Sequence, residues 1–332
     1  MRGCRAGRWL IAALALAACA PQRREKLVLG TVHLPALGLV YVAQARGYFA
    51  AHGLDVEQRR FAAGRDAVAA LGAGRIDAAT AFETPVVLRA ARDPSLRVLT
   101  TIHVASANTR LVARADRGIS TPSDLAGKRV GVPRNTNAEY FLDLLLAWGG
   151  LSQRDVRLVE VDPGNAAGAL GSGEVDAVAI WAPRSQEARR VAGPRGAVEM
   201  TSEVYTELSL LVTRQPVLAA RRGAFVKLVA ALADAERLVR ERPGEAFAAL
   251  RAGFADVSEA DLAEAWAAVR PTLGLTHQLA AALEDESRWF RAAGRVEGAP
   301  LDVGALLEPD VLAEVDPEAV TFVPPPRRAG KE

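Results

Sequence analysis

The chain has 332 residues, half of them apolar, and its 41 basic and 39 acidic side chains leave a formal net charge of +2. Since a domain typically has about 150 residues, this length allows one large domain or two ordinary ones. The balanced charge argues against a nucleic-acid-binding surface, and the four histidines are too far apart in the chain to form a metal-binding motif.

Residues 1–18 have the pattern of a secretory leader, because three arginines precede an apolar run that is too short to cross a bilayer as a helix. Cys19 directly follows a Leu-Ala-Ala triplet. This resembles the bacterial lipobox and predicts acylation of Cys19 and anchoring to a membrane. The alternative is a plain leader with an incidental cysteine. Residues 19–25 would form a tether, and with Cys4 in the leader the exported body would have neither a disulfide nor a cysteine nucleophile.

The first part of the body alternates predicted strands and helices. Within it, residues 70–78 read ALGAGRIDA, where a glycine pair ends an alanine-rich helix and a strand that runs to Phe82 begins at once. The other expected strands cover residues 26–31, 56–61 and 98–104, and further helices cover about 41–46 and 84–92.

The same pattern returns in the second part of the body. Residues 169–177 read ALGSGEVDA, and the apolar strand that follows runs to Trp181. Two tandem β-α-β-α-β units predict an α/β fold of two similar lobes, each with a mixed sheet flanked by helices. The other expected elements are strands at 129–132, 156–161 and near Val198, and helices over about 137–148 and 183–192.

Two extended runs are expected to connect the lobes as an antiparallel, two-segment hinge. Residues 108–114 would carry the chain out of the first lobe, and the apolar run 207–213 would carry it back. The predicted limits are 26–108 and 208–332 for lobe one and 109–207 for lobe two.

After Gln215 the pattern is helical throughout, with apolar residues spaced by three and four and breaks at Pro243, Gly253 and Pro271. This helical C-terminal tail is expected to cover lobe one.

Open α/β sheets bind ligands outside the carboxyl ends of their strands, so two facing lobes would place several loops around one cleft. The most informative loop is residues 133–139, PRNTNAE, directly ahead of an apolar helix. Free N–H groups and about half a positive charge at a helix start form a site for an anionic oxygen, although one of the polar side chains is expected simply to cap the helix. The candidate ligand-binding residues are Leu34, Pro35, Arg65, Phe82, Glu83, Asn135, Thr136, Asn137, Asp162 and Trp181.

Several of these residues have a purely structural alternative. Phe82 and Trp181 occupy matching positions in the two units, which favours a cleft lining over a place in the core. Arg65 begins a helix, where it is either an anion contact or a solvated surface charge. Asp77 and Asp176 are expected to bond the backbone of turns and to bind no ligand.

Three carboxylates near the predicted cleft, Glu83, Glu139 and Asp162, would repel a simple anion. Either they lie at the surface, or the ligand carries a cationic or amide-donor group.

Signals for an enzyme are absent from the sequence: there is no nucleophile elbow and no phosphate-binding glycine loop before a lysine. We expect no catalytic residue, no cofactor and no metal.

With these residues in place, the chain resembles the substrate-binding proteins of ABC importers, in the group that includes the nitrate, sulfonate, taurine and thiamine-pyrimidine binders. The resemblance implies a two-lobed periplasmic-binding-protein fold of type II. One departure is Ala182, where many relatives have Glu after Trp, and this weakens any transfer of ligand identity. The matching stretches are GYF at 47–49, GLDV at 53–56, ALGAGRID at 70–77, DLAGKRVGV at 124–132, GEVDAVAIW at 173–181 and DPEAV at 316–320.

The resemblance implies an exported, monomeric solute receptor, lipid-anchored in the cell envelope and on the periplasmic side in a Gram-negative host. It would close over a small anionic or zwitterionic solute, such as a sulfonate, taurine, nitrate or a pyrimidine, and deliver it to a permease with its ATPase subunit. One rival is an enzyme on the same scaffold, as in thiamine-pyrimidine synthesis, where a cleft lysine and histidines work with pyridoxal phosphate. Export and the lack of lysine on the cleft loops argue against it. A ligand sensor for a signalling partner remains open.

Overall fold

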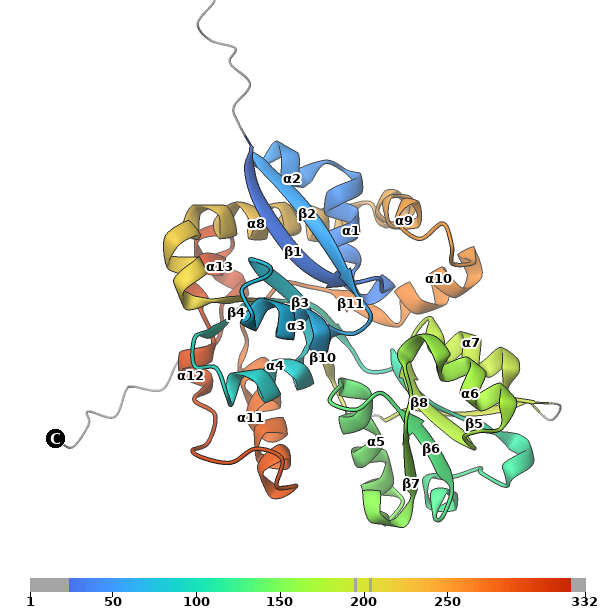
Figure 1. Cartoon of the computed structure of the whole chain (residues 1–332). Helices are drawn as coiled ribbons and strands as arrows, with labels where there is room; N and C mark the ends of the chain where they lie inside the picture. Colours follow the sequence, from blue (N-terminus) through green and yellow to red (C-terminus); the bar gives the residue numbers. More distant parts are fainter. Residues whose placement is uncertain (1–23, 194–195, 203–204, 324–332) are drawn as a thin grey trace, which may run out of the picture.

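The computed structural model describes residues 24–193, 196–202 and 205–323. The expected leader, Cys19 and most of the tether lie outside these residues. The described chain forms two α/β lobes that lie side by side, with the C-terminal helices gathered on the first (Figure 1). No helix within the described ranges has the length and apolarity needed to cross a membrane.

The first lobe contains a six-stranded mixed sheet with strand order β11-β4-β10-β3-β1-β2. Strands β2, β1 and β3 are parallel, and β10 runs antiparallel between β3 and β4. Every residue of β3 is buried, as expected of a strand near the middle of an α/β sheet with helices on its faces. The strands are β1 (Glu25–Val32), β2 (Leu54–Phe61), β3 (Ala78–Phe82), β4 (Leu96–Ala105), β10 (Glu207–Arg214) and β11 (Val269–Pro271).

The second lobe contains a five-stranded mixed sheet with strand order β7-β6-β8-β5-β9. Here β7, β6 and β8 are parallel, while β5 runs antiparallel to β8 and β9. The central strand β8 is again buried at every residue. The strands are β5 (Thr109–Arg114), β6 (Arg129–Val132), β7 (Arg157–Glu160), β8 (Ala177–Trp181) and β9 (Ala197–Met200).

Each helix, like each strand, belongs to one of the two lobes. In the first lobe they are α1 (Gly38–Ala45), α2 (Tyr48–Ala51), α3 (Gly64–Gly72), α4 (Glu83–Ala90), α8 (Gln215–Glu241), α9 (Pro243–Ala252), α10 (Glu259–Ala267), α11 (His277–Ala292), α12 (Val303–Leu306) and α13 (Pro309–Val315). The second lobe has α5 (Asn137–Trp148), α6 (Ala166–Ser172) and α7 (Arg184–Val191). Short 3₁₀ turns are η1 (Pro35–Leu37), η2 (Ala115–Arg117), η3 (Pro122–Leu125), η4 (Gln153–Asp155), η5 (Pro163–Asn165) and η6 (Pro317–Ala319).

The sequence repeat corresponds to a structural repeat, β2-β1-β3 in one sheet and β7-β6-β8 in the other. Its two aspartates have the same role. Asp77 Oδ2 accepts the N–H of Val28 at 2.8 Å, and Asp176 Oδ2 accepts the N–H of Arg129 at 2.9 Å. The expected backbone-bonding role is confirmed, although the partner is the neighbouring strand rather than the turn.

The C-terminal tail contains one strand that the helical pattern does not predict. β11 pairs antiparallel with the end of β4, Val269 opposite Ala105. The expectation that all of the chain after Gln215 is helical is therefore wrong here. β11 is at the edge of its sheet, where a proline such as Pro271 is tolerated because no ladder hydrogen bond depends on its nitrogen.

Each of the two runs that were expected to form the hinge is a strand in the sheet of one lobe. β5 belongs wholly to the second sheet and β10 to the first. The links are therefore shorter than predicted, with residues 106–108 leading out and the chain between Met200 and Glu207 leading back. The predicted lobe limits remain a proposal, which the membership of the sheets supports.

Candidate functional site

The ends of the two matching strands face each other between the lobes. Phe82 ends β3, Trp181 ends β8, and their ring centroids are 6.0 Å apart with an interplanar angle of 45°. Both side chains are buried, at 5% and 2% exposure. Strand ends of two α/β sheets therefore meet at one place, where such folds bind ligands.

The start of α5 differs from the expected capped helix. Thr136 occupies the N-cap position, but its hydroxyl donates a hydrogen bond to the carbonyl of Pro133 at 2.6 Å. Asn135 has a positive φ of 60°, and its backbone N–H donates to Glu139 Oε2 at 2.7 Å. The predicted side-chain cap is therefore wrong for the residues described: the side chain at the N-cap does not accept from the first N–H groups of the helix, and Glu139 places a carboxylate in its first turn.

Glu139 is fully buried and paired with arginines from both lobes. Arg134 Nε lies 2.8 Å from Glu139 Oε1, and Arg295 Nη1, from the segment after α11, lies 2.9 Å from the same oxygen. Arg295 also donates to the side chain of Asn135. The surface interpretation of Glu139 is therefore wrong, because its charge joins the lobes.

Arg65 also bridges the lobes rather than extending into solvent. Its guanidinium lies 3.2 Å from Glu160 Oε1 at the end of β7 and donates to the carbonyl of Arg134. Asp162 differs from both, since it is exposed and its carboxylate accepts the N–H of Gly164 at 2.8 Å within η5. Asp162 is thus the one carboxylate of the three for which the surface interpretation holds.

Leu34 and Pro35 lie at the start of η1, directly after β1, and both are buried. Leu34 belongs to the apolar core. A ligand contact for these two residues stays a proposal.

Glu207, the first residue of β10, is the acceptor at the centre of the junction between the lobes and is only 1% exposed. Its carboxylate accepts hydrogen bonds from Asn108 Nδ2 at 2.7 Å, from Asn137 Nδ2 at 3.0 Å and from the hydroxyl of Thr109. His103 Nε2 lies 3.2 Å away. Since Thr109 and Asn137 belong to the second lobe, Glu207 holds the two lobes together.

The sequence interpretation missed Glu207 because it treated residues 207–213 as an apolar run. One signal was available: a charged residue at the head of an otherwise apolar strand, close to the expected crossing between lobes. A buried charge in such a place requires partners.

Glu83 begins α4 and is fully buried beside this centre, so its surface interpretation is also wrong. It accepts hydrogen bonds from the N–H of Leu208 at 2.9 Å and from the hydroxyl of Tyr205. Burial, and then the nearby charge of Glu207, raises the pKa of Glu83 to about 7. Burial also raises the pKa of Glu286 in α11 well above its usual range, and Glu286 accepts from Thr84 at 2.8 Å.

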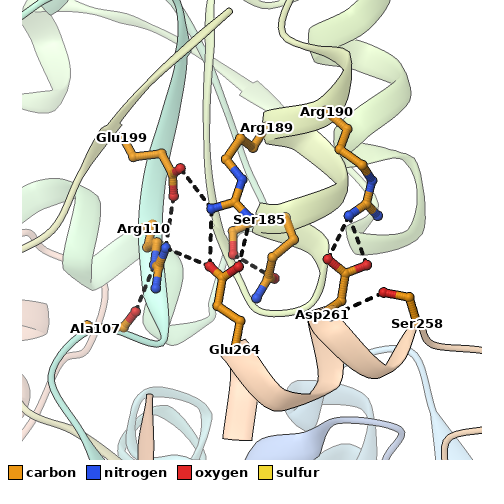
Figure 2. A network of polar contacts seen from close by, with 10 residues as sticks. Ala107, Arg110, Ser185, Arg189, Arg190, Glu199, Ser258, Asp261 and Glu264 are labelled. Carbon is orange, nitrogen blue, oxygen red and sulfur yellow. Dashed lines mark hydrogen bonds and ion pairs between the residues drawn. The ribbon is translucent and has the colours of Figure 1, made fainter. Parts of the chain in front are cut away.

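A network of ion pairs joins the second lobe to α10 of the first lobe (Figure 2). Arg189 Nη2 lies 2.7 Å from Glu264 Oε2, and Arg110 Nη1 lies 2.9 Å from Glu199 and 3.2 Å from Glu264. The hydrogen bond to Arg189 holds the pKa of Glu264 below its usual range. We call this group the α10 network; it comprises Arg110, Arg189, Arg190, Glu199, Asp261 and Glu264.

Two cavities are lined by residues of both lobes. One, of about 580 Å³, lies between the end of β1 and α7, and its lining includes His33, Pro183 and Arg184. The other, of about 540 Å³, lies along α3 and α4 and includes Arg65 and Asn135. The structure thus brings Phe82, Glu83, Asn137 and Trp181 to the centre of the junction between the lobes, places Arg65 and Asn135 at the second cavity, and leaves Asp162 outside.

Comparisons with known proteins agree with this architecture. The chain is 27% identical to a binding protein of Brucella abortus over 224 residues, which are 67% of this chain and 68% of the relative. It is 30% identical to the taurine-binding periplasmic protein of Escherichia coli over 143 residues, 43% of this chain and 44% of that protein.

A solved structure with the same fold is the alkanesulfonate-binding protein SsuA of Xanthomonas axonopodis pv. citri, bound to MOPS. The TM-score is 0.75 at 21% identity, covering 86% of this chain and 99% of that one. The expected two-lobed binding-protein fold is thereby confirmed. The family model described as NMT1/THI5 like matches residues 35–246, so this chain belongs to the NMT1/THI5-like family.

Proposed function

We propose that this chain is the solute-binding component of an ABC importer, which binds a small anionic or zwitterionic solute between its lobes and delivers it to a membrane permease. The observation that carries the proposal is the meeting of Phe82 and Trp181, the ends of two matching strands, 6.0 Å apart between the lobes. The relatives support it, since one is named for taurine and a structure of the same fold for alkanesulfonates.

Binding would proceed by closure about the two links between the sheets. A solute that contacts both lobes binds the closed form better and so shifts the population toward it. The contacts of Arg65 with Glu160 and of Glu207 with Asn137 join different lobes, and they would form only on closure. We propose that the solute contacts Leu34, Pro35, Arg65, Phe82, Glu83, Asn135, Thr136, Asn137 and Trp181, with Asp162 at the rim.

An anionic group of the solute would be received at the start of α5. This helix has 12 residues, enough for a developed dipole, and its N-cap hydroxyl is turned back to Pro133. The partial positive charge of a helix start stabilises an anion by about 0.3–1 kcal/mol, more where the site is partly buried.

We further propose that Cys19 is acylated and holds the protein on the outer side of a membrane as a monomer. Several acyl chains at about 0.8 kcal/mol per buried CH₂ anchor a protein stably. Expression of Cys19→Ser in a bacterial host should move the protein from the membrane fraction to the soluble envelope fraction; equal partition of both forms would refute the anchor.

A binding role is favoured over the enzymatic alternative. The relatives named above are binding proteins, and the lysines of the chain, Lys26, Lys128, Lys227 and Lys331, are all outside the proposed cleft loops. A pyridoxal phosphate enzyme on this scaffold needs a cleft lysine, so the positions of the four lysines count against that alternative.

The proposal is tested by a thermal-shift screen of the purified protein with nitrate, alkanesulfonates, taurine, aminopyrimidines and aromatic acids. A true solute should raise the melting temperature and bind with one-to-one stoichiometry in calorimetry. It should also reduce the radius of gyration in small-angle X-ray scattering. If no solute of these classes binds, or if binding leaves the radius of gyration unchanged, the proposal fails.

A further inference from the structure

Two acids from different helices of the first lobe lie together at the junction, and we call them the acid pair: Glu83 of α4 and Glu286 of α11. Each is at most 1% exposed. Thr84 donates its hydroxyl to Glu286 at 2.8 Å, while Glu83 accepts the N–H of Leu208 at 2.9 Å and the hydroxyl of Tyr205. All three donors are uncharged, and among the described residues no basic side chain makes an ion pair with either acid. Two buried carboxylates that share a site without a cation do not both stay ionised, so the acid pair retains a proton.

The side chains around the acid pair add negative charge. Burial and then the charge of Glu207 raise the pKa of Glu83 to about 7. Burial, the charge of Glu83 and a hydrogen bond with Glu83 hold the pKa of Glu286 well above its usual range. The titratable side chains that lie around the pair are Glu207 of β10, His103 of β4, which faces Glu207, Tyr205 of the link between β9 and β10, Tyr140 of α5 and Asp285 of α11.

The charged groups of the other elements beside the pair have partners of their own. β3 has no titratable residue, and the charged side chains of α3 and α5 are bonded elsewhere, as is Asp285. Their partners are Glu160 for Arg65, the N–H of Ala63 for Asp66, Arg134 and Arg295 for Glu139, Trp289 for Asp143, and Arg288 for Asp285. None of these contacts brings a cation to the acid pair, so its proton is not replaced by a positive side chain.

Tyr205 connects the acid pair to the second lobe. It is only 4% exposed, and its ring lies 5.8 Å from that of Tyr140 and 6.0 Å from that of Phe141, both in α5. Tyr140 also lies edge-on to Trp289 of α11 at 5.0 Å, so α5 packs against both Tyr205 and the helix that holds Glu286. If the second lobe turned away, α5 would leave Tyr205 and water would reach the acid pair, where it would favour the ionised form.

We propose that closure of the lobes is coupled to a proton: with α5 packed against Tyr205 the acid pair holds a proton, and with the lobes apart it releases that proton. Solute binding would then take up a proton from solution, whatever the solute is. This inference rests on the proposed function and goes beyond it, because it makes the proton a second ligand of the receptor.

The direction of the effect follows from which form binds the proton. Between the ordinary pKa of 4.5 and the raised pKa of about 7, the acid pair is protonated when the lobes are packed and ionised when water surrounds it. Solute affinity should therefore fall as the pH rises through this range, by at most about 10-fold per pH unit for one proton, and it should level off above about pH 8.

Ethanesulfonate is a suitable probe, because its sulfonate does not titrate in this range. Calorimetric titrations of the purified protein in buffers of different ionisation enthalpy measure the number of protons taken up on binding. We expect uptake of about half a proton or more at about pH 6, and an affinity at least about 5-fold higher at about pH 5.5 than at about pH 7.5. Binding without proton uptake would overturn the inference and leave the proposed function standing.

If ethanesulfonate does not bind, the proposed function loses support, and the protein without solute tests the inference by itself. Protonation should shift the population toward the form with packed lobes, so the radius of gyration in small-angle X-ray scattering should be smaller at about pH 5.5 than at about pH 8. Equal radii would overturn the inference.

The variant Glu286→Gln assigns the proton to the acid pair. The amide is neutral at every pH, still accepts the hydroxyl of Thr84 and offers an N–H to Glu83, so it imitates the protonated pair. Proton uptake should fall close to zero, and at about pH 8 the variant should bind ethanesulfonate several-fold more tightly than the wild-type protein. The matched control is Glu284→Gln, an exposed glutamate of the same helix, which should behave as wild type. Uptake that persists in Glu286→Gln would assign the proton to another group, such as His103, and refute the inference.

A second variant keeps the test valid if Glu286→Gln does not fold, as judged by circular dichroism. Tyr205→Phe leaves every charge in place and removes the hydroxyl that donates to Glu83, a hydrogen bond that lowers the pKa of Glu83. Proton uptake should then extend to higher pH and exceed that of the wild-type protein at about pH 8. A folded Tyr205→Phe variant with the wild-type uptake at every pH would refute the role of the acid pair.

Discussion

Strands β3 and β8 occupy the same place in the two lobes, but the residues that follow them differ. Phe82 is followed by Glu83, a buried acid, whereas Trp181 is followed by Ala182. The second lobe has its own buried carboxylate, Glu139, but arginines lie 2.8 and 2.9 Å from it. The two lobes therefore share their folding devices and differ at the junction: among the described residues, Glu139 of the second lobe is paired with arginines, whereas Glu83 of the first lobe is paired with none.

The repeated features of the two units stabilise the fold, whereas the residues at the strand ends differ between the lobes. The aspartates Asp77 and Asp176 hold equivalent strands in both lobes, because each β-α-β-α-β unit has the same backbone to satisfy. The strand ends differ instead in the residues that follow them, Glu83 in the first lobe and Ala182 in the second.

The largest effect is expected from Trp181→Ala, which removes the second lobe's half of the aromatic contact. Solute affinity should fall by about 30-fold or more, since a buried aromatic anchor contributes about 2 kcal/mol or more, while circular dichroism retains the folded spectrum. Calorimetry with a solute found in the screen measures this. The matched control is Trp148→Ala, because Trp148 is 70% exposed at the end of α5. An unchanged dissociation constant for Trp181→Ala would reject its assigned role.

The equivalence of the two aspartates predicts similar losses of stability. Asp77→Ala and Asp176→Ala each remove a bond to a strand N–H and should each lower the free energy of unfolding by about 1–3 kcal/mol. The loss should be larger for Asp176, because its pair with Arg129 at 2.7 Å is shorter than the pair of Asp77 with Arg221 at 3.1 Å. Urea unfolding measures both, with Glu174→Ala as an exposed control expected to change stability by less than about 0.5 kcal/mol. If one variant is destabilised and the other is not, the two units are not equivalent.

The buried acid of the first lobe predicts a pH dependence with a definite sign. The pKa of Glu83 is raised to about 7 from a value of 4.5, so the folded protein keeps a proton that the unfolded chain releases. Stability is therefore highest below pH 4.5 as far as this group is concerned, and it falls as the pH rises through about 7. The pKa of Glu286 is raised as well, so it acts in the same direction.

Glu83→Gln should flatten this dependence, because the amide does not titrate and still accepts the N–H of Leu208. The measurement is the difference in unfolding free energy between pH 5 and pH 8, compared with Glu284→Gln, an exposed glutamate of α11. A wild-type slope in Glu83→Gln would show that other groups produce the pH dependence.

The sequence predicts most of the fold because the two units repeat their helix ends, their strands and their terminal aromatics. Its errors come from contacts between distant segments. Glu139 and Arg295 are far apart in the chain, so no local pattern shows that they pair. Pro271 indicates a helix break in a sequence, yet it fits an edge strand once β4 is beside it.

The centre of the site was only half predictable for the same reason. Phe82, Trp181 and Asn137 follow from their places at strand and helix ends, where α/β sheets bind ligands. Glu207 does not, because its partners come from three other segments of the chain. The packing of the two lobes against each other brings Asn137 to this carboxylate, and pairing of β4 with β10 brings His103 to it.

The smallest effect is expected at the edge of the cleft, in the α10 network. Glu264→Gln removes the charge that pairs with Arg189 and Arg110. These side chains are partly exposed, and exposed pairs contribute about 0.2–1 kcal/mol each. Solute affinity should therefore fall by only a few-fold. The difference in affinity between the wild-type protein and the variant should shrink when salt is raised from about 50 mM to about 500 mM, because the Debye length falls well below about 10 Å and screening weakens the attraction.

The control on the same helix is Glu259→Gln, which alters an exposed residue at the start of α10. If Glu264→Gln instead abolished binding at every salt concentration, closure would depend on the α10 network more than on the buried centre. The contacts that control closure would then be the partly exposed ion pairs of the α10 network. A small, salt-sensitive loss would show that closure depends more on the buried contacts between the lobes, such as that of Glu207 with Asn137.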